Sequence, residues 1–165
     1  MSRTSWWASK VRQLGSHLVA RVSPRERDDL AAWLRPAELE LFDSMHVADR
    51  RHGLDVAALL RRGGVRDRDV LAAAVLHDCA KGDTGVLPRV AWSLGEAYGS
   101  RVWSIARRVP GWEAALTRLE SHADASADLV AAAGLPPFAV DLVRYQDDPR
   151  DARYGAAFHA ADEAC

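Results

Sequence analysis

Most glycines and prolines of this chain stand between segments with helical apolar spacing rather than inside them. Alanine is abundant, and no segment shows the alternation of β-branched residues that is typical of strands. This placement of glycine and proline predicts a series of helices joined by short turns. The expected fold is therefore all-α, a single-domain helical bundle.

The expected helices follow from local start and stop signals. Ser23, followed by Pro24 and by Glu26, is typical of a capping box, and Gly63 with Gly64 is a stop signal. The expected ranges are a helix from residue 24, one from 36, and others over 47–62, from about 67 to Gly82, 88–109, 112–133 with a break near His122, 136–146, and 150 to the end.

Length and charge exclude several classes of protein. A chain of 165 residues fits one domain, and a net charge of −1 offers no general basic field for nucleic acid. No apolar run approaches the ~20 residues of a membrane span, and the first residues lack the pattern of a signal peptide. Two cysteines are too few for a disulfide framework and favour a reducing compartment. We expect a cytoplasmic protein.

Four polar residues continue apolar helix faces. Asp78 ends the stripe of Leu71 and Val75, and His77 ends the neighbouring one, while His52 shares a face with apolar residues on the preceding helix. Asp162 is stacked four residues after Phe158 in the last helix. Because a buried carboxylate needs a partner, two imidazoles and two carboxylates pointing inward from three helices predict a divalent-cation site.

Each of these residues also has a plainer interpretation. A single histidine such as His52 is more often a hydrogen-bonded core residue than a ligand. Asp78 could accept hydrogen bonds from a nearby loop, and Asp162 could simply be solvated. His46 is interpreted as a surface or helix-start residue. The joint pattern favours the metal site.

Three motifs, "RHGLDVAALL", "LAAAVLHDCAKGD" and "FHAADEAC", resemble the successive motifs of the HD-domain metal-dependent phosphohydrolases. The resemblance covers about residues 46–162. The expected HD domain is 46–165, with residues 1–45 expected to form amino-terminal helices packed on it. The resemblance implies a helical bundle around the metal, with Mn, Fe, Co, Ni or Mg as the ion. The implied ligands are His52, His77, Asp78 and Asp162. His46 competes with His52 for the first ligand position, but the residues that follow His52 fit the family pattern better.

Two features depart from that family's pattern. Ala80 stands where glycine is common, and Cys79 stands at a usually apolar position, where we interpret it as a small buried hydrophobe. Some family members hold a second metal through two further histidines. His122 matches the first, but Tyr145 occupies the second position. We therefore expect one tightly held metal, with any second ion needing water, substrate or a carboxylate such as Asp147 or Asp148.

The resemblance implies hydrolysis of a nucleotide or another small phosphate ester. Asp78, Lys81 and Asp83 are the catalytic candidates, although Asp83 beside Gly82 also fits a turn or cap. The candidates for substrate binding are Arg51, Lys81, His122, Arg144 and Tyr145. The alternatives are a non-catalytic HD module that binds nucleotide or metal, and an oxygen-using di-iron enzyme.

The first residues carry a separate signal. Trp7, Val11, Leu14, Leu18 and Val22 form an apolar stripe with basic residues around it. Such a helix could lie on an anionic membrane surface. Packing against the bundle, or against a second protomer in a homodimer, is the simpler expectation.

Overall fold

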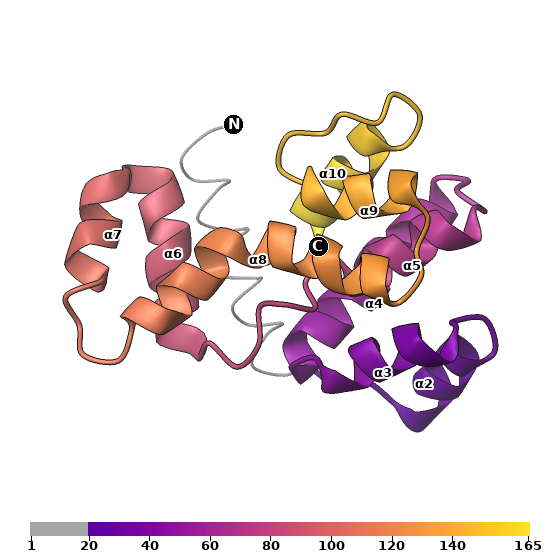
Figure 1. The fold of residues 1–165 in the computed structure, drawn as a ribbon, viewed down its shortest axis with the longest axis horizontal. Helices are drawn as coiled ribbons and strands as arrows, with labels where there is room; N and C mark the ends of the chain where they lie inside the picture. Colours follow the sequence, from indigo (N-terminus) through magenta and orange to yellow (C-terminus); the bar gives the residue numbers. More distant parts are fainter. Residues whose placement is uncertain (1–19) are drawn as a thin grey trace.

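A computed structural model describes residues 20–165, which fold into helices without a strand (Figure 1). The all-α, single-domain expectation is confirmed for this part of the chain. The helices are α2 (Pro24–Ala31), α3 (Pro36–Ser44), α4 (Val47–Arg62), α5 (Arg68–Leu76), α6 (Val86–Tyr98), α7 (Ser100–Ala106), α8 (Glu113–Ala132), α9 (Pro137–Arg144) and α10 (Gly155–Ala164).

Helix α5 is the centre of the bundle. Every residue from Val70 to Leu76 is buried, and the helix contacts α3, α4, α8 and α9. Helix α4 packs along α5 and also contacts α10. The two central helices approach closely at Gly53, where an added Cβ would lie 2.3 Å from the carbonyl oxygen of Val75. The absence of a side chain there lets α4 and α5 pack backbone against backbone.

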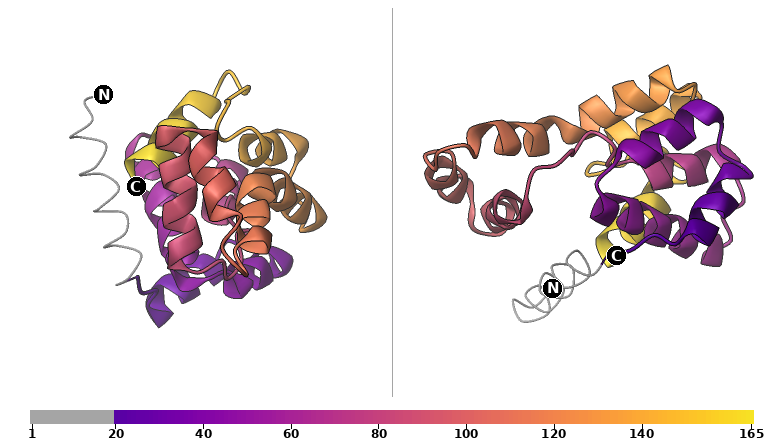
Figure 2. Two further views of the ribbon diagram at one scale, coloured as in Figure 1. Left: turned by 90° about the vertical axis from the view of Figure 1, so that its left-hand side faces the viewer. Right: turned by 90° about the horizontal axis from the view of Figure 1, so that it is seen from below.

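Helices α6 and α7, with the first half of α8, form an arm that extends from the bundle (Figures 1 and 2). The arm has its own small core around Ala91, Ala106 and Leu116. Trp92 and Trp103 stack with their ring centroids 4.9 Å apart, and the Trp103 indole donates to the Trp92 carbonyl at 3.1 Å. Helix α8 is continuous from the arm into the bundle, so it joins the two parts.

Several expected helix boundaries are confirmed and others are wrong. The capping box at Ser23 and the range 47–62 agree with the structure. Helix α5 ends at Leu76 instead of continuing to Gly82. Gly99, with φ of +95°, divides the expected helix 88–109 into α6 and α7, because this backbone conformation ends α6. The expected break near His122 does not occur, since α8 is continuous there.

The expected amino-terminal unit is described only in part. Leu30, Leu34 and Phe42 belong to the main core, so α2 and α3 pack on the bundle. Of the amino-terminal apolar stripe, Val22 is described and packs against the same core. The other stripe residues lie outside the described range.

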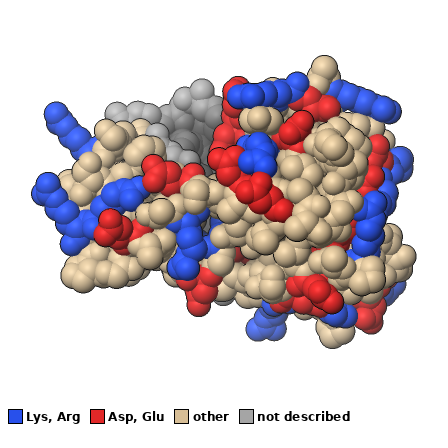
Figure 3. Space-filling model, in the orientation of Figure 1, with Lys and Arg blue, Asp and Glu red and all other residues tan. Residues whose placement is uncertain are grey.

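The surface of the described residues carries both signs of charge. Acidic and basic side chains are interspersed over the face seen in Figure 3. Among residues 20–165, no helix combines the length and apolar character that crossing a membrane requires.

Candidate metal centre

His77 and Asp78 turn inward immediately after α5 ends. His77 caps the helix with near-helical backbone angles, so the chain keeps turning and both side chains stay on the bundle side. The exposed fractions are 1% for His77 and 2% for Asp78. The ring of His77 is oriented by its Nδ1, which lies 2.9 Å from the carbonyl oxygen of Ala74. This backbone contact fixes Nδ1 as the donor and directs Nε2 into the bundle.

His52 from α4 and Asp162 from α10 meet His77 at this point. His52 Nε2 lies 2.7 Å from Asp162 Oδ1, and His77 Nε2 lies 3.2 Å from the same oxygen. One ligand atom from each of these three residues falls within 4.8 Å of the other two. Ligand atoms bound at about 2.1 Å around one ion stand roughly 3 to 4 Å apart. The three side chains are therefore nearly in position to share a metal ion.

Asp78 stands at the edge of this group. Its Oδ2 lies 3.5 Å from His77 Nε2 and accepts a hydrogen bond from Lys81 Nζ at 2.6 Å. Its Oδ1 lies 3.5 Å from His122 Nε2. The carboxylate thus connects the three-residue group to Lys81 on one side and to His122 on the other.

Two buried atoms of the site have no hydrogen-bond partner within the described part of the chain. They are His77 Nε2 and Asp78 Oδ1. If Nδ1 of His77 donates to Ala74, a neutral ring turns the lone pair of Nε2 toward carboxylate oxygens, which repel it. A cation between these atoms, or a proton on Nε2, removes the repulsion. The donor set of imidazole nitrogen and carboxylate oxygen fits a divalent transition metal.

The electrostatics of the site favour bound positive charge. Burial lowers the pKa of His77, but Asp78 and Asp162 outweigh it and raise the pKa to about 9. Burial raises the pKa of Asp162, yet His77 and His52 outweigh it and hold that pKa below its ordinary value. Asp78 behaves in the same way: burial raises its pKa, and His77 and Lys81 outweigh that effect and lower it. Both carboxylates are therefore ionised and available to a metal.

His122 has a partner that sequence reasoning missed. Its Nδ1 lies 2.6 Å from the carbonyl of Leu119, and its Nε2 lies 2.9 Å from Nε2 of Gln146. Burial is the main cause that lowers the pKa of His122, followed by Lys81, so the ring is neutral near pH 7. Its Nε2 lone pair then accepts from the Gln146 amide. Gln146 is 3% exposed, and its Oε1 is buried with no hydrogen-bond partner in the described chain.

A sequence signal for Gln146 does exist. Ala139, Leu142, Val143 and Gln146 are spaced i, i+3, i+4 and i+7, and all four are buried. Tyr145, which we expected to face the site, follows the end of α9, and the guanidinium of Arg150 lies 3.8 Å from its ring centroid. The buried face that begins on α9 therefore continues to Gln146 and does not include Tyr145.

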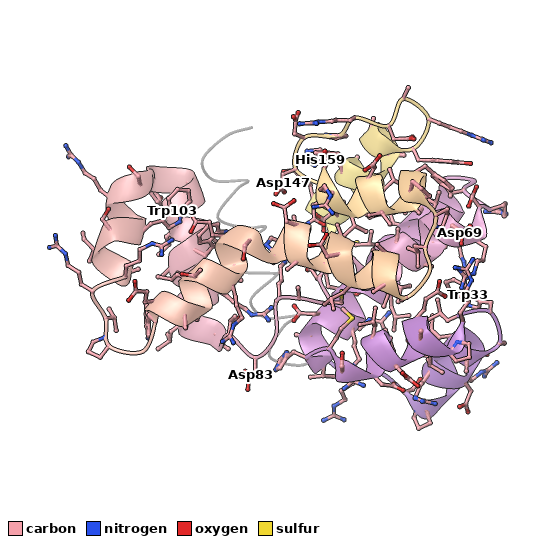
Figure 4. All side chains as sticks on the ribbon, viewed as in Figure 1. Trp33, Asp69, Asp83, Trp103, Asp147 and His159 are labelled. Atoms are coloured by element: carbon pink, nitrogen blue, oxygen red, sulfur yellow. The ribbon has the colours of Figure 1, made fainter. Side chains whose placement is uncertain are left out.

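Three other sequence candidates lie apart from the ligand group. Arg51 binds Glu26 and Asp55 at 2.6 and 2.7 Å. Arg144 binds two exposed aspartates of α8 at 2.8 and 2.6 Å. Asp83 is exposed in the loop before α6 and points away from the ribbon (Figure 4). None of the contacts described for these residues joins them to the four expected ligands.

The remaining candidates lie as follows. His46 is the N-cap of α4, where its Nδ1 accepts from Ala48 N at 3.3 Å, as expected of a helix-start residue. Cys79 is buried, and burial raises the pKa of its thiol to about 11, in agreement with its interpretation as a small hydrophobe. Asp147 and Asp148 are exposed, in the turn that follows Gln146 (Figure 4).

A second missed element is the buried ion pair of Asp49 and Arg89. Asp49 lies one turn before His52 on α4, and both carboxylate oxygens accept from the Arg89 guanidinium at 2.5 and 2.8 Å. The signal was again a helix face, since Asp49, Gly53 and Val56 form one buried stripe. Sequence alone did not identify the partner, because Arg89 lies forty residues away on α6.

Comparisons with protein-family models, with curated proteins and with solved structures found no match to this chain. A proposal of function therefore depends on the chemistry and geometry of the residues themselves.

Proposed function

We propose that this protein is a metal-dependent phosphohydrolase of the HD type that cleaves a small phosphate ester, such as a nucleotide. One divalent cation, drawn from Mn, Fe, Co, Ni and Mg, would be held by His52, His77, Asp78 and Asp162. The two-cysteine composition and the buried thiol of Cys79 support a reducing compartment such as the cytoplasm.

The observation that carries this proposal is the pair of unpartnered buried atoms, His77 Nε2 and Asp78 Oδ1. Native proteins seldom leave buried polar atoms without partners, because each one costs about 1 to 3 kcal/mol. Here two of them lie beside Asp162 and His52, which are themselves suited to metal binding. A shared ion would satisfy His77 Nε2 and, with a small movement of Asp78, its Oδ1 as well.

The chain's own residues supply the rest of the chemistry. A divalent cation in this position would lower the pKa of a bound water and polarise a phosphoryl oxygen. Burial lowers the pKa of Lys81, but Asp78, Asp162 and Asp49 outweigh it and raise that pKa, so Lys81 remains an ammonium near pH 7. Its Nζ can move from Asp78 to a phosphate oxygen when substrate enters. His122 would orient the Gln146 amide, whose second N–H would donate to the ester beside Asp78.

The test combines metal analysis with an unbiased screen. Protein purified without chelators should contain about one equivalent of a transition metal or bind one on titration. Phosphate release from a panel of nucleotides and other monoesters should then depend on that metal. The matched variants are Asp78→Asn and the surface change Asp128→Asn. Failure of every metal in the set to bind the wild-type protein would refute the proposal.

A specific contact favours a second candidate, a non-catalytic module. Lys81 Nζ already neutralises Asp78 Oδ2 at 2.6 Å, and a proton on His77 would balance Asp162. This charge network is complete without a metal and could serve as a structural or regulatory element. Phosphate release separates the candidates, since the module would bind a nucleotide or metal without turnover.

A further inference from the structure

Lys81 lies in a segment that is fixed at both of its sides. On the amino-terminal side, the backbone N–H of Ala80 donates to Ser126 Oγ of α8 at 3.0 Å. On the carboxyl-terminal side, the carbonyl of Gly82 accepts from Arg89 at 3.0 Å, and Thr84 Oγ1 accepts from Arg89 Nε at 2.7 Å. Two different helices therefore hold the backbone around the lysine.

Arg89 links this segment to α4. Three of its nitrogens contact Asp49, Thr84 and Gly82 at once, and the Arg89 side chain is 16% exposed. Four N–H bonds of one rigid guanidinium are thus committed, which leaves little capacity for a substrate phosphate. Arg89 is therefore unlike Lys81, whose side chain makes one described hydrogen bond, to Asp78.

The backbone of the 80–84 segment has little stiffness of its own. Gly82 has a φ of +60° and the following Gly85 a φ of +70°, and glycine can adopt many other backbone conformations once its contacts are lost. Apart from the Arg89 contacts, α6 packs little against α4. Its main neighbours are α7 and α8 of the arm. The ion pair of Arg89 with Asp49 is therefore the principal polar contact between α6 and α4, the helix that carries His52.

We infer that Arg89 is a positioning residue of the candidate metal centre: it holds the 80–84 segment against α4 so that Lys81 Nζ stays on Asp78. Loss of Arg89 should free the segment and displace the Lys81 ammonium, while the imidazole and carboxylate ligands remain in place on α4, α5 and α10. The effect on turnover rests on the proposed function; the effect on the position of Lys81 does not.

The composition of the chain provides a direct readout. Its only lysines are Lys10 and Lys81, so a Lys10→Arg background leaves Lys81 as the single target of a lysine-specific protease. Cleavage after Lys81 requires the segment to leave its anchors and enter the protease as an extended strand. The cleavage rate without denaturant therefore reports local release of the segment.

Three variants in this background separate local release from general instability. Arg89→Met removes all four bonds, and Arg89→Gln keeps an amide N–H for Asp49 but cannot also reach Thr84 and Gly82; neither change adds a lysine. The matched control is Arg68→Met, which breaks the buried pair of Arg68 with Glu38 at α3, on a part of α5 remote from Lys81. Both Met variants lose a guanidinium that pairs with a buried carboxylate.

The expected cleavage rate rises at least tenfold in Arg89→Met, rises by a smaller factor in Arg89→Gln, and changes less than threefold in Arg68→Met. Equal rates in Arg89→Met and the parent would overturn the inference. Equal increases in Arg89→Met and Arg68→Met would also overturn it, since general instability would then explain the result. Should Arg89→Met fail to fold, the comparison of Arg89→Gln with Arg68→Gln decides in the same way.

Turnover and metal binding provide the second readout. Arg89→Met should lower kcat at least tenfold and leave the Co²⁺ dissociation constant within threefold, and adding Lys81→Met should cause no further loss. A parallel loss of Co²⁺ affinity would show that Arg89 supports the ligands rather than Lys81 and would overturn the inference. If the wild-type protein has no turnover, the proposed function is refuted, and the cleavage comparison alone decides the role of Arg89.

Discussion

Asp78→Asn provides the sharpest test of the metal centre, because asparagine keeps the shape of the side chain and removes its charge. A ligand that binds only the folded state stabilises it by about 4.1 kcal/mol at a concentration one thousand times its Kd. For a chain of this length, each kcal/mol corresponds to about 2 to 4 °C in Tm. Saturating Mn²⁺ or Co²⁺ should therefore raise the Tm of the wild-type protein by roughly 8 to 16 °C.

In Asp78→Asn that increase should nearly disappear. The variant also loses the partner of Lys81, so its metal-free Tm will differ from the wild-type value. The relevant quantity is therefore the change in Tm caused by metal within each protein, measured by scanning calorimetry with and without the ion. Asp128→Asn, whose carboxylate is 74% exposed, should keep the full increase. An undiminished metal-dependent increase in Asp78→Asn would refute the ligand assignment.

Three further predictions concern packing, protonation and metal number. Gly53→Ala should lower the free energy of unfolding by about 1 to 3 kcal/mol or more, measured by urea titration, because the new Cβ would collide with the Val75 carbonyl. In metal-free protein, the raised pKa of His77 contributes stability that is fully present below pH 6.5 and is lost as pH rises through about 9. The loss should approach roughly 3 kcal/mol, and pH-independent stability between about 6 and 10 would contradict it. Elemental analysis should find one tightly bound metal in the wild-type protein. Gln146→His should increase occupancy of a second site, whereas Tyr145→His, whose side chain lies beside Arg150, should not.

Helix periodicity was sufficient to predict the all-α fold and the inward direction of four polar side chains, the candidate ligands. His52, His77, Asp78 and Asp162 each shared a helix face with apolar residues, and the structure brings their side chains close to one another. Local spacing is informative here because a helix face is decided by residues three and four apart. The ends of helices were harder to predict. Helix α5 ends at Leu76, and a few residues later the backbone N–H of Ala80 donates to Ser126 Oγ. That hydrogen bond joins residues 46 positions apart, so local spacing could not predict it.

Surface arginines show why the substrate-binding candidates were less predictable. Arg51 and Arg144 stand beside His52 and Tyr145 in the sequence, but successive residues of a helix point in different directions. Their guanidinium groups pair with Glu26, Asp55 and the aspartates of α8. The partners of long side chains are set by tertiary packing, which adjacency in the sequence does not specify.

The charges around the site connect metal binding to substrate binding. Among the described residues, three buried or half-buried carboxylates, those of Asp49, Asp78 and Asp162, face two permanent cations, Lys81 and Arg89. With neutral histidines the group has a net charge of −1, and a proton on His77 brings it to zero. Exchange of that proton for a divalent cation changes the net charge to +1. Under the proposed function, a metal-loaded site would therefore attract an anion, and Lys81 would be the cation to leave Asp78 for a phosphate, because Arg89 is committed to Asp49, Thr84 and Gly82.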